Sequence, residues 1–190
     1  MPGPSLKLRR DNTALVVIDA QDRLASAMHS DSLNRAVKSW VSFVEIAALL
    51  KLPICVSEQY PKGLGRTLPV LREALSKMMP PPLFIEKTDF SLAGTALFNQ
   101  FLNNGRKQLI LVGMETHICV FQTARDLAAR GYEVYVPLDG VVSRARHNWR
   151  IGLELIRNAG GTVSSMEALL FDLIERAEGD EFRAVSKMVK

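Results

Sequence analysis

The sequence predicts a three-layer α/β domain in which a mainly parallel sheet of six strands is covered by helices on both faces. Two observations lead to this fold class. Short apolar runs alternate along the chain with longer stretches in which apolar residues recur at steps of three and four. The short runs are typical of buried strands, and the longer stretches are typical of amphipathic helices. Strands separated by helices connect through crossovers, so we expect a Rossmann-like αβα arrangement with parallel neighbours.

The first third of the chain predicts two strands around one long helix. Residues Ala14–Ile18 are all apolar and form the first strand, and Ile54–Val56 form the second. Between them, apolar residues from Leu33 to Ala47 keep helical spacing, and Pro53 ends the helix. The following stretch, Glu58 to Leu68, is rich in proline and glycine, so we expect a loop there.

The middle of the chain predicts a helix, a strand and a second helix. The first helix runs through Leu71 and Leu75, and three prolines, Pro80–Pro82, stop it. Leu83–Ile85 is the third strand because it is a short apolar run between these prolines and polar residues. Residues Thr95–Leu102 then form the next helix.

The last part of the chain begins with the fourth strand, Gln108–Val112. It leads into a helix that contains Cys119 and ends near Gly131, since glycine is the usual residue after a helix. The remaining elements are a strand, a helix, a short sixth strand and two helical segments, which cover Tyr132–Val136, His147–Asn158, Thr162–Val163, Met166–Leu173 and Phe182–Met188.

Length and composition limit the possible classes of protein. A chain of 190 residues with 47% hydrophobic content predicts a single domain over residues 1–190. Two cysteines are too few for a disulfide framework, which favours a reducing, cytoplasmic setting. No apolar run approaches the ~20 residues of a membrane span, so no membrane partner is expected. The net charge of +4 is spread along the chain, which is typical of a solvated surface and does not favour nucleic-acid binding.

Three reactive side chains follow strands of the predicted sheet. Asp19 comes after the first strand, Lys87 after the third and Cys119 after the fourth. Ligands bind at the carboxyl ends of the strands in such sheets, so we expect these residues to lie together. Asp19, partly desolvated, can accept the thiol proton of Cys119. Lys87 would place a positive charge beside both residues and keep the sulfur ionised.

Each of these residues also has a purely structural interpretation. An aspartate after a strand is often a turn former, a lysine is usually on the surface, and an isolated cysteine is often a core residue. The position of Cys119 favours reactivity. If Gly113 ends the strand and Thr116 is the helix N-cap, the sulfur lies in the first helical turn, where the helix dipole favours the thiolate. Cys55, inside a strand, is expected to pack in the core.

Several motifs, in this order, resemble those of the isochorismatase-like cysteine hydrolases. They are Val17-Ile18-Asp19-Ala20-Gln21, Glu86-Lys87-Thr88-Asp89-Phe90-Ser91, Gly113-Met114-Glu115-Thr116-His117-Ile118-Cys119-Val120, Thr123-Ala124 and Asp139-Gly140-Val141-Val142-Ser143-Arg144. The resemblance spans residues 11–171 and implies the isochorismatase-like hydrolase fold. It implies that Asp19 is the general base, Lys87 the supporting cation and Cys119 the nucleophile.

The resemblance also implies how the site is completed. It implies a cis peptide bond between Met114 and Glu115 and an oxyanion hole formed by the backbone N–H groups of Ile118 and Cys119. The side chains expected to contact substrate are Gln21, Phe90, Glu115 and Thr116. The implied activity is hydrolysis of a small amide at its carbon–nitrogen bond through a thioester, with a small-molecule substrate and without a cofactor.

Departures from the wider family narrow the expected substrate. Nicotinamidase members carry an aspartate and two histidines as metal ligands after the second strand, whereas Ser57–Gly65 contains no histidine. His29, His117 and His147 lack the spacing of metal ligands, so we expect neither a metal nor nicotinamide. Members that cleave isochorismate typically lack the cysteine, so that reaction is not expected either. The same segment resembles isochorismatase-domain-containing proteins, where it is either a glycine-rich turn or part of the substrate site.

Two other functions stay open. Cys119 and Arg125 match the C-x5-R spacing of cysteine phosphatases, but the residues between them contain no glycine and predict a helix, which cannot wrap a phosphate. The second alternative is a non-enzymatic binding or scaffold protein with the same fold. The presence of all three reactive residues disfavours it.

The resemblance also implies a homo-oligomer, a dimer or larger. Trp40 and Phe43 belong either to the core or to a subunit contact, and the amphipathic segment Phe182–Met188 is a further candidate for such a contact.

Overall fold

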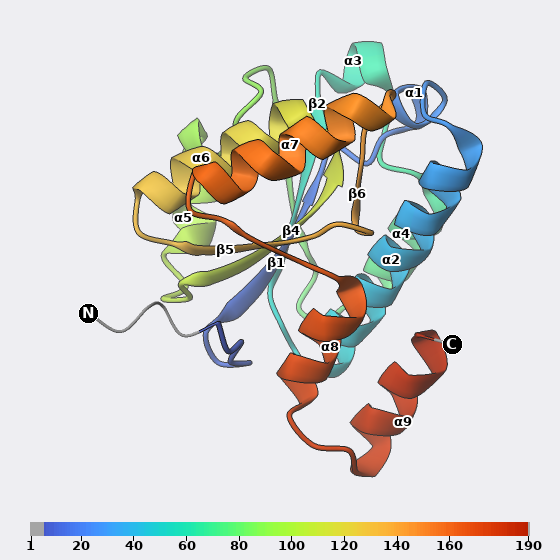
Figure 1. Ribbon diagram of the computed structural model, residues 1–190, viewed down its shortest axis with the longest axis vertical. Helices are drawn as coiled ribbons and strands as arrows, with labels where there is room; N and C mark the ends of the chain where they lie inside the picture. Colours follow the sequence, from blue (N-terminus) through green and yellow to red (C-terminus); the bar gives the residue numbers. More distant parts are fainter. Residues whose placement is uncertain (1–5, 190) are drawn as a thin grey trace.

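The computed structural model describes residues 6–189, so the expected domain of residues 1–190 extends beyond them at both ends (Figure 1). Within the described residues, a seven-stranded parallel sheet has the order β3-β2-β1-β4-β5-β7, and β6 pairs with β4. The strands are β1 (Thr13–Ile18), β2 (Ile54–Gln59), β3 (Leu83–Lys87), β4 (Gln108–Met114), β5 (Glu133–Pro137), β6 (Val141–Val142) and β7 (Thr162–Ser164). The α-helices are α1 (Asp22–Ala25), α2 (Ser30–Leu49), α3 (Pro61–Leu64), α4 (Pro69–Ser76), α5 (Ala96–Leu102), α6 (Phe121–Ala129), α7 (Arg146–Asn158), α8 (Met166–Ile174) and α9 (Gly179–Met188). A 3-10 turn, η1 (Leu92–Gly94), and a π-helical turn, η2 (Thr116–Val120), complete the elements. The three-layer α/β class is therefore confirmed.

The central strands are apolar on both faces because helices cover both. In β1, Leu15 and Val17 face one core, whereas Val16 and Ile18 face the other. Successive side chains of a strand point to opposite faces, so an unbroken apolar run is the pattern of a strand that is buried on both sides. Cys55 of β2 is fully buried in the second core, as expected for a packing residue.

Four helices, α2, α4, α8 and α9, cover the first face, and α5, α6 and α7 cover the second (Figure 1). Trp40 and Phe43 of α2 are buried in the first core, and Trp40 Nε1 donates to the backbone oxygen of Gly140 at 2.6 Å. Helix α9 contacts α8 and α2, and its Val185 is fully buried. The subunit-contact interpretation of Trp40 and Phe43 is therefore wrong, while the expected homo-oligomer stays a prediction. No helix in residues 6–189 combines the length and the apolar character needed to cross a membrane.

The structure corrects the expected elements at several places. Strand β6 was not expected, because two residues are too few to show a period. Strand β2 continues to Gln59, and α3 follows it, so the expected loop from Glu58 onward is largely regular. Pairing explains the longer strand: Glu58 and Gln59 are in register with Glu86 and Lys87 of β3, although polar residues by themselves indicate a loop. The helix expected from Thr116 begins instead as η2 and becomes α-helical only in α6.

Gly113 lets β4 pass close to β1. Its φ is +123°, and a Cβ at this position would lie 1.9 Å from the backbone oxygen of Ile18. We expect Gly113→Ala to lower the free energy of unfolding by about 3 kcal/mol, because positive φ and an overpacked contact each destabilise the native state. Urea denaturation measures the change. Gly94→Ala is the control, since a Cβ at Gly94 meets nothing within 4 Å, and equal stabilities of the two variants would contradict the prediction.

Candidate active site

The candidate site lies at the point in the sheet where the strand order reverses, between β1 and β4. Strand β1 lies between β2 and β4. The connections from β1 to β2 and from β2 to β3 use helices of the first face, whereas those from β3 to β4 and from β4 to β5 use helices of the second. Beside such a reversal, the carboxyl ends of the strands form a crevice where ligands bind. Asp19 directly follows β1, Lys87 ends β3, and Cys119 lies in η2 after β4.

A buried ion pair joins two of the predicted residues. Lys87 Nζ lies 2.7 Å from Asp19 Oδ2, and the two side chains are 1% and 0% exposed. Lys87 Nζ also donates to Gln59 Oε1 at 2.6 Å and to the backbone oxygens of Asp89 and Phe90, each at 3.1 Å. These acceptors from three segments hold the ammonium group in place. The surface interpretation of Lys87 is wrong.

Ser57 and Gln59 position this ion pair, and the sequence did not single them out. Ser57 Oγ donates to Asp19 Oδ1 at 2.6 Å, so each carboxylate oxygen has its own donor. Ser57 and Gln59 are two residues apart on β2 and therefore point to the same face of the sheet. The sequence did contain a signal for these two residues, because their spacing of two positions is that of one face of a strand. It was missed because the expected second strand ended at Val56.

Cys119 is 5% exposed and contacts the same carboxylate. Burial raises the pKa of the Cys119 thiol far above its usual range, and Asp19 raises it further through its charge and a hydrogen bond. Lys87 acts in the opposite direction but is outweighed. This raised pKa favours a resting thiol over the expected resting thiolate, because burial penalises the charged form. The carboxylate that accepts the thiol's hydrogen bond is suitably placed to act as its base.

The turn that contains Cys119 differs from the expected first turn of an α-helix. Its residues form the π-helical turn η2, and the peptide bond from Met114 to Glu115 is cis. The Ile118 N–H donates to the backbone oxygen of Glu115 at 3.0 Å, so one of the two expected oxyanion donors already has a partner. Thr116 is not the N-cap: Glu115 holds that position, and Thr116 Oγ1 is buried without a hydrogen-bond partner among residues 6–189.

Gln21 and Phe90 differ in their availability to a substrate. Gln21 Nε2 donates to the backbone oxygens of Gln59 at 3.0 Å and Gly65 at 2.7 Å, and its Oε1 accepts from the Gln59 N–H at 2.7 Å. These hydrogen bonds connect the residues after β1 to the end of β2 and to the residue after α3. Because both amide hydrogens of Gln21 are used in this way, its expected role in substrate binding is corrected to a structural role. The ring of Phe90 is exposed, and its backbone contacts Lys87.

Two contacts fasten η2 to the segment before α7. Glu115 is 5% exposed, and its carboxylate accepts from the backbone N–H of Arg144 at 2.9 Å and from the guanidinium Nε at 3.1 Å. His117 Nδ1 lies 3.1 Å from Ser143 Oγ. Among residues 6–189, no three or more His, Cys, Asp or Glu side chains form a group that could hold a metal ion.

Arg125 does not complete a phosphate-binding loop with Cys119. It pairs with Asp126 at 2.9 Å and lies over the ring of Phe121. Helix α6 begins at Phe121, so the intervening residues do not curl around a ligand. The phosphatase alternative is therefore wrong.

Comparison with known proteins identifies the family. The model of the Isochorismatase domain matches residues 13–168, which include Asp19, Lys87 and Cys119. The chain belongs to the isochorismatase family. The family includes hydrolases such as nicotinamidases, and the resemblance seen in the sequence is confirmed.

Relatives of this isochorismatase family protein cover nearly its whole length. Isochorismatase domain-containing protein 2 of Bos taurus is 30% identical over 190 residues, which are 100% of this chain and 85% of the relative. The solved structure of the MAR1 ribonuclease from Caenorhabditis elegans is 33% identical with a TM-score of 0.88, over 96% of this chain and 92% of that one. The nicotinamidase PncA from Bacillus subtilis is 19% identical with a TM-score of 0.71, over 81% of this chain and 99% of that one, and shares the fold.

Removing one partner of the buried ion pair should destabilise this isochorismatase family protein strongly. In Lys87→Met, Asp19 stays buried without its cation, and we expect the free energy of unfolding to fall by about 3 to 5 kcal/mol. The double variant Asp19→Asn/Lys87→Met contains neither charge and should recover most of that loss. Urea denaturation of both variants tests this. A double variant no more stable than Lys87→Met would show that the pair contributes little.

Asp19→Asn should make Cys119 more reactive toward iodoacetamide. The substitution removes a charge and a hydrogen bond that both raise the thiol pKa, so more thiolate is present at neutral pH. We expect several-fold faster alkylation, followed by mass spectrometry of the Cys119 peptide across pH. The fully buried Cys55 is the internal control for unfolding. Slower alkylation in Asp19→Asn would mean that the carboxylate activates the resting sulfur.

Proposed function

We propose that this protein is a cysteine hydrolase that cleaves the carbon–nitrogen bond of a small amide through a thioester on Cys119. The main support is the arrangement of three residues: the buried Cys119 thiol lies within the influence of the Asp19 carboxylate, which is itself paired with Lys87. A nucleophile beside a base that a third group orients is the arrangement of covalent acyl transfer. The fold shared with a nicotinamidase is a second line of support.

Attack on the amide and transfer of the thiol proton occur together. As the sulfur bonds to the carbonyl carbon, its proton passes to Asp19 and the carbonyl electron pair moves to oxygen. The raised pKa of Cys119 requires this coupling, because little thiolate exists before the attack. Lys87 and Ser57 hold the carboxylate at the sulfur while the proton moves.

Backbone N–H groups of η2 stabilise the oxyanion. We assign this role to the Cys119 N–H and to the Ile118 N–H, which the substrate oxygen shares with the backbone oxygen of Glu115. One such donor contributes about 3 kcal/mol in comparable acyl-transfer enzymes. When the tetrahedral intermediate collapses, the carbon–nitrogen bond breaks and Asp19 gives its proton to the departing amine.

Water completes the reaction. The Asp19 carboxylate takes a proton from water as the water oxygen bonds to the thioester carbon. The carbon–sulfur bond then breaks, and the proton returns from Asp19 to sulfur. The products are a carboxylic acid and ammonia or an amine, and the resting thiol is restored.

Phe90, Glu115 and Thr116 are the side chains that we propose face the substrate. Phe90 has an exposed ring and contacts Lys87 through its backbone oxygen, and Glu115 and Thr116 are the N-cap and first residue of the turn that contains the nucleophile. Thr116 Oγ1 is buried and has no partner among the described residues, so a polar group of the substrate can satisfy it.

A panel of small amides tests the proposal by release of ammonia or amine. Cys119→Ala should abolish any activity found, because no other side chain at the site forms the thioester, whereas Cys55→Ala should retain it. Intact-protein mass spectrometry of the unmodified protein, quenched with acid during turnover of a cleaved amide, should reveal an acyl group held on sulfur that Cys119→Ala does not form. Activity that persists in Cys119→Ala would exclude the mechanism.

The same preparations distinguish the alternatives. Incubation with RNA addresses the activity named for the Caenorhabditis elegans relative. Cleavage of RNA that is unchanged in Cys119→Ala would separate that activity from this site. A protein that cleaves no amide and forms no acyl adduct would instead support the binding or scaffold function.

A further inference from the structure

A cavity of about 720 Å³ lies between the N-terminal ends of α2 and α7. Its wall consists of the first two turns of α2, the first turn of α7, and residues 138, 139 and 141–144 around β6. Asp19, Lys87 and Cys119 do not line it. Two lining residues contact the candidate active site from outside: Arg144 pairs with Glu115, and Ser143 contacts His117. The cavity is therefore a neighbour of that site and not a part of it.

Three arginines line this cavity, and two of them have no carboxylate partner among residues 6–189. The guanidinium group of Arg146, the first residue of α7, has no hydrogen bond or ion pair with residues 6–189. Arg35 of α2 has one long contact, 3.4 Å from its Nη2 to Ser32 Oγ. Arg144 is the third guanidinium group, and it is already held by Glu115. Two guanidinium groups thus remain open to an anion, and guanidinium groups bind carboxylates through paired hydrogen bonds.

Among the described residues, neither carboxylate at the cavity, Asp31 or Asp139, forms an ion pair with Arg35 or Arg146. Asp139 Oδ1 accepts from the backbone N–H of Met166 at 2.8 Å, so this carboxylate is used by the fold. Asp31 lies in the first turn of α2, where the helix dipole already favours a negative charge. The N-cap residues of the two helices, His29 and Ala145, make no side-chain capping bond. Their N-terminal dipoles add positive potential to that of the arginines.

An aromatic and aliphatic wall completes the cavity. Trp149 lies one turn into α7, and its Nε1 donates to the backbone oxygen of Leu138 at 3.1 Å, which fixes the plane of the indole ring. The side chains of Leu138, Val141 and Val142 line the cavity beside it. Small-molecule sites commonly combine such an apolar wall with a few polar groups that orient the ligand.

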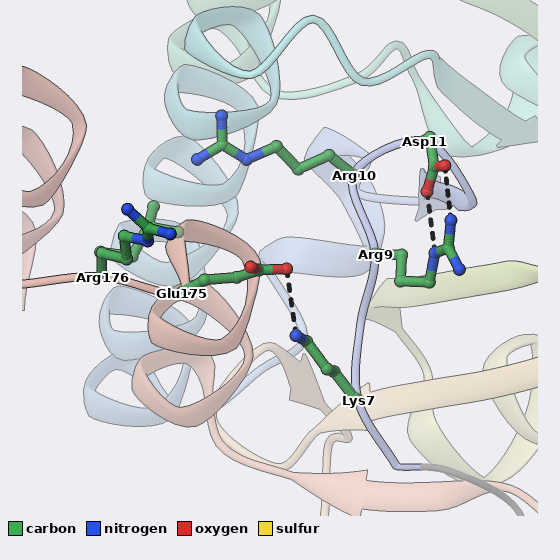
Figure 2. Close-up of a pocket in the computed structure, with 7 residues that line it drawn as sticks. Lys7, Arg9, Arg10, Asp11, Glu175 and Arg176 are labelled. Atoms are coloured by element: carbon green, nitrogen blue, oxygen red, sulfur yellow. Dashed lines mark hydrogen bonds and ion pairs between the residues drawn. The ribbon is translucent and has the colours of Figure 1, made fainter.

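A second cavity, beside the residues that precede β1, is a useful contrast because its charges are paired internally (Figure 2). Arg9 pairs with Asp11 at 2.8 Å, and Lys7 pairs with Glu175 at 3.3 Å. Arg10 is held by Glu181, which is not drawn in Figure 2. An anion that entered there would have to displace these carboxylates, so it is the cavity between α2 and α7 that is ready to receive one.

We propose that the cavity between α2 and α7 binds a small organic carboxylate with an apolar or aromatic body. The carboxylate pairs with Arg35 and Arg146, and the body lies against Trp149. This binding does not require Cys119 and does not rest on the proposed hydrolysis.

Tryptophan fluorescence of the full chain tests the proposal with benzoate as the probe. The chain has two tryptophans, and Trp40 is fully buried in the core, so a saturable change reports Trp149. We expect saturation below about 10 mM benzoate, the range of a weak small-molecule site. Benzyl alcohol, which has the ring but no charge, should not produce it. Isothermal titration calorimetry gives the affinity independently of the fluorophore.

Matched variants locate the binding. Arg35→Ala/Arg146→Ala should weaken benzoate binding at least about tenfold, because both paired contacts are lost. Lys38→Ala/Arg150→Ala removes the same charge from exposed positions on the same two helices and should bind as the unmodified protein does. Cys119→Ala should also bind normally. The proposal is overturned by any of three results: no saturable binding, equal weakening in both double variants, or loss of binding in Cys119→Ala, which would place benzoate in the active site.

Discussion

The buried ion pair between Asp19 and Lys87 is the interaction on which the candidate site depends. Two charges removed from water are stable only where their geometry is good and their other hydrogen-bonding groups are satisfied. Strand β2 meets both conditions, because it lies between β1 and β3 and supplies Ser57 to the carboxylate and Gln59 to the ammonium group. The register of three neighbouring strands therefore decides whether the pair can form.

The same ion pair sets the state of Cys119. A carboxylate beside a buried thiol keeps the proton on sulfur, and the charge of Lys87 does not overcome burial. The site thus contains a ready base and a neutral nucleophile, and sulfur gains negative character only as a carbonyl group accepts its electrons. A resting thiol is also less open to oxidation and alkylation than a thiolate, since both reactions follow thiolate character.

A second ion pair, between Glu115 and Arg144, lies beside the turn that contains Cys119. Glu115 begins this turn and pairs with Arg144, which also lines the cavity between α2 and α7. The candidate active site and this cavity differ in how their charges are paired. The charges at Asp19 are matched within the protein, whereas Arg35 and Arg146 face the cavity and have no carboxylate partner in the part of the chain that the structure describes. Matched charges suit proton transfer in a closed site, and unmatched cations suit the binding of an anion from solution.

The sequence by itself determined the order of the six expected strands and the long helices between them, and the three reactive residues that follow strands, because the periods of β1, β4 and α2 are local and need no partner to be read. It did not determine the end of β2, where Ser57 and Gln59 look like loop residues until β3 pairs with them. Nor did it determine β6, the role of Gln21 or the protonation of Cys119. Only the tertiary structure decided these, because hydrogen bonding and thiol pKa depend on distances between residues far apart in the chain and on the exclusion of water.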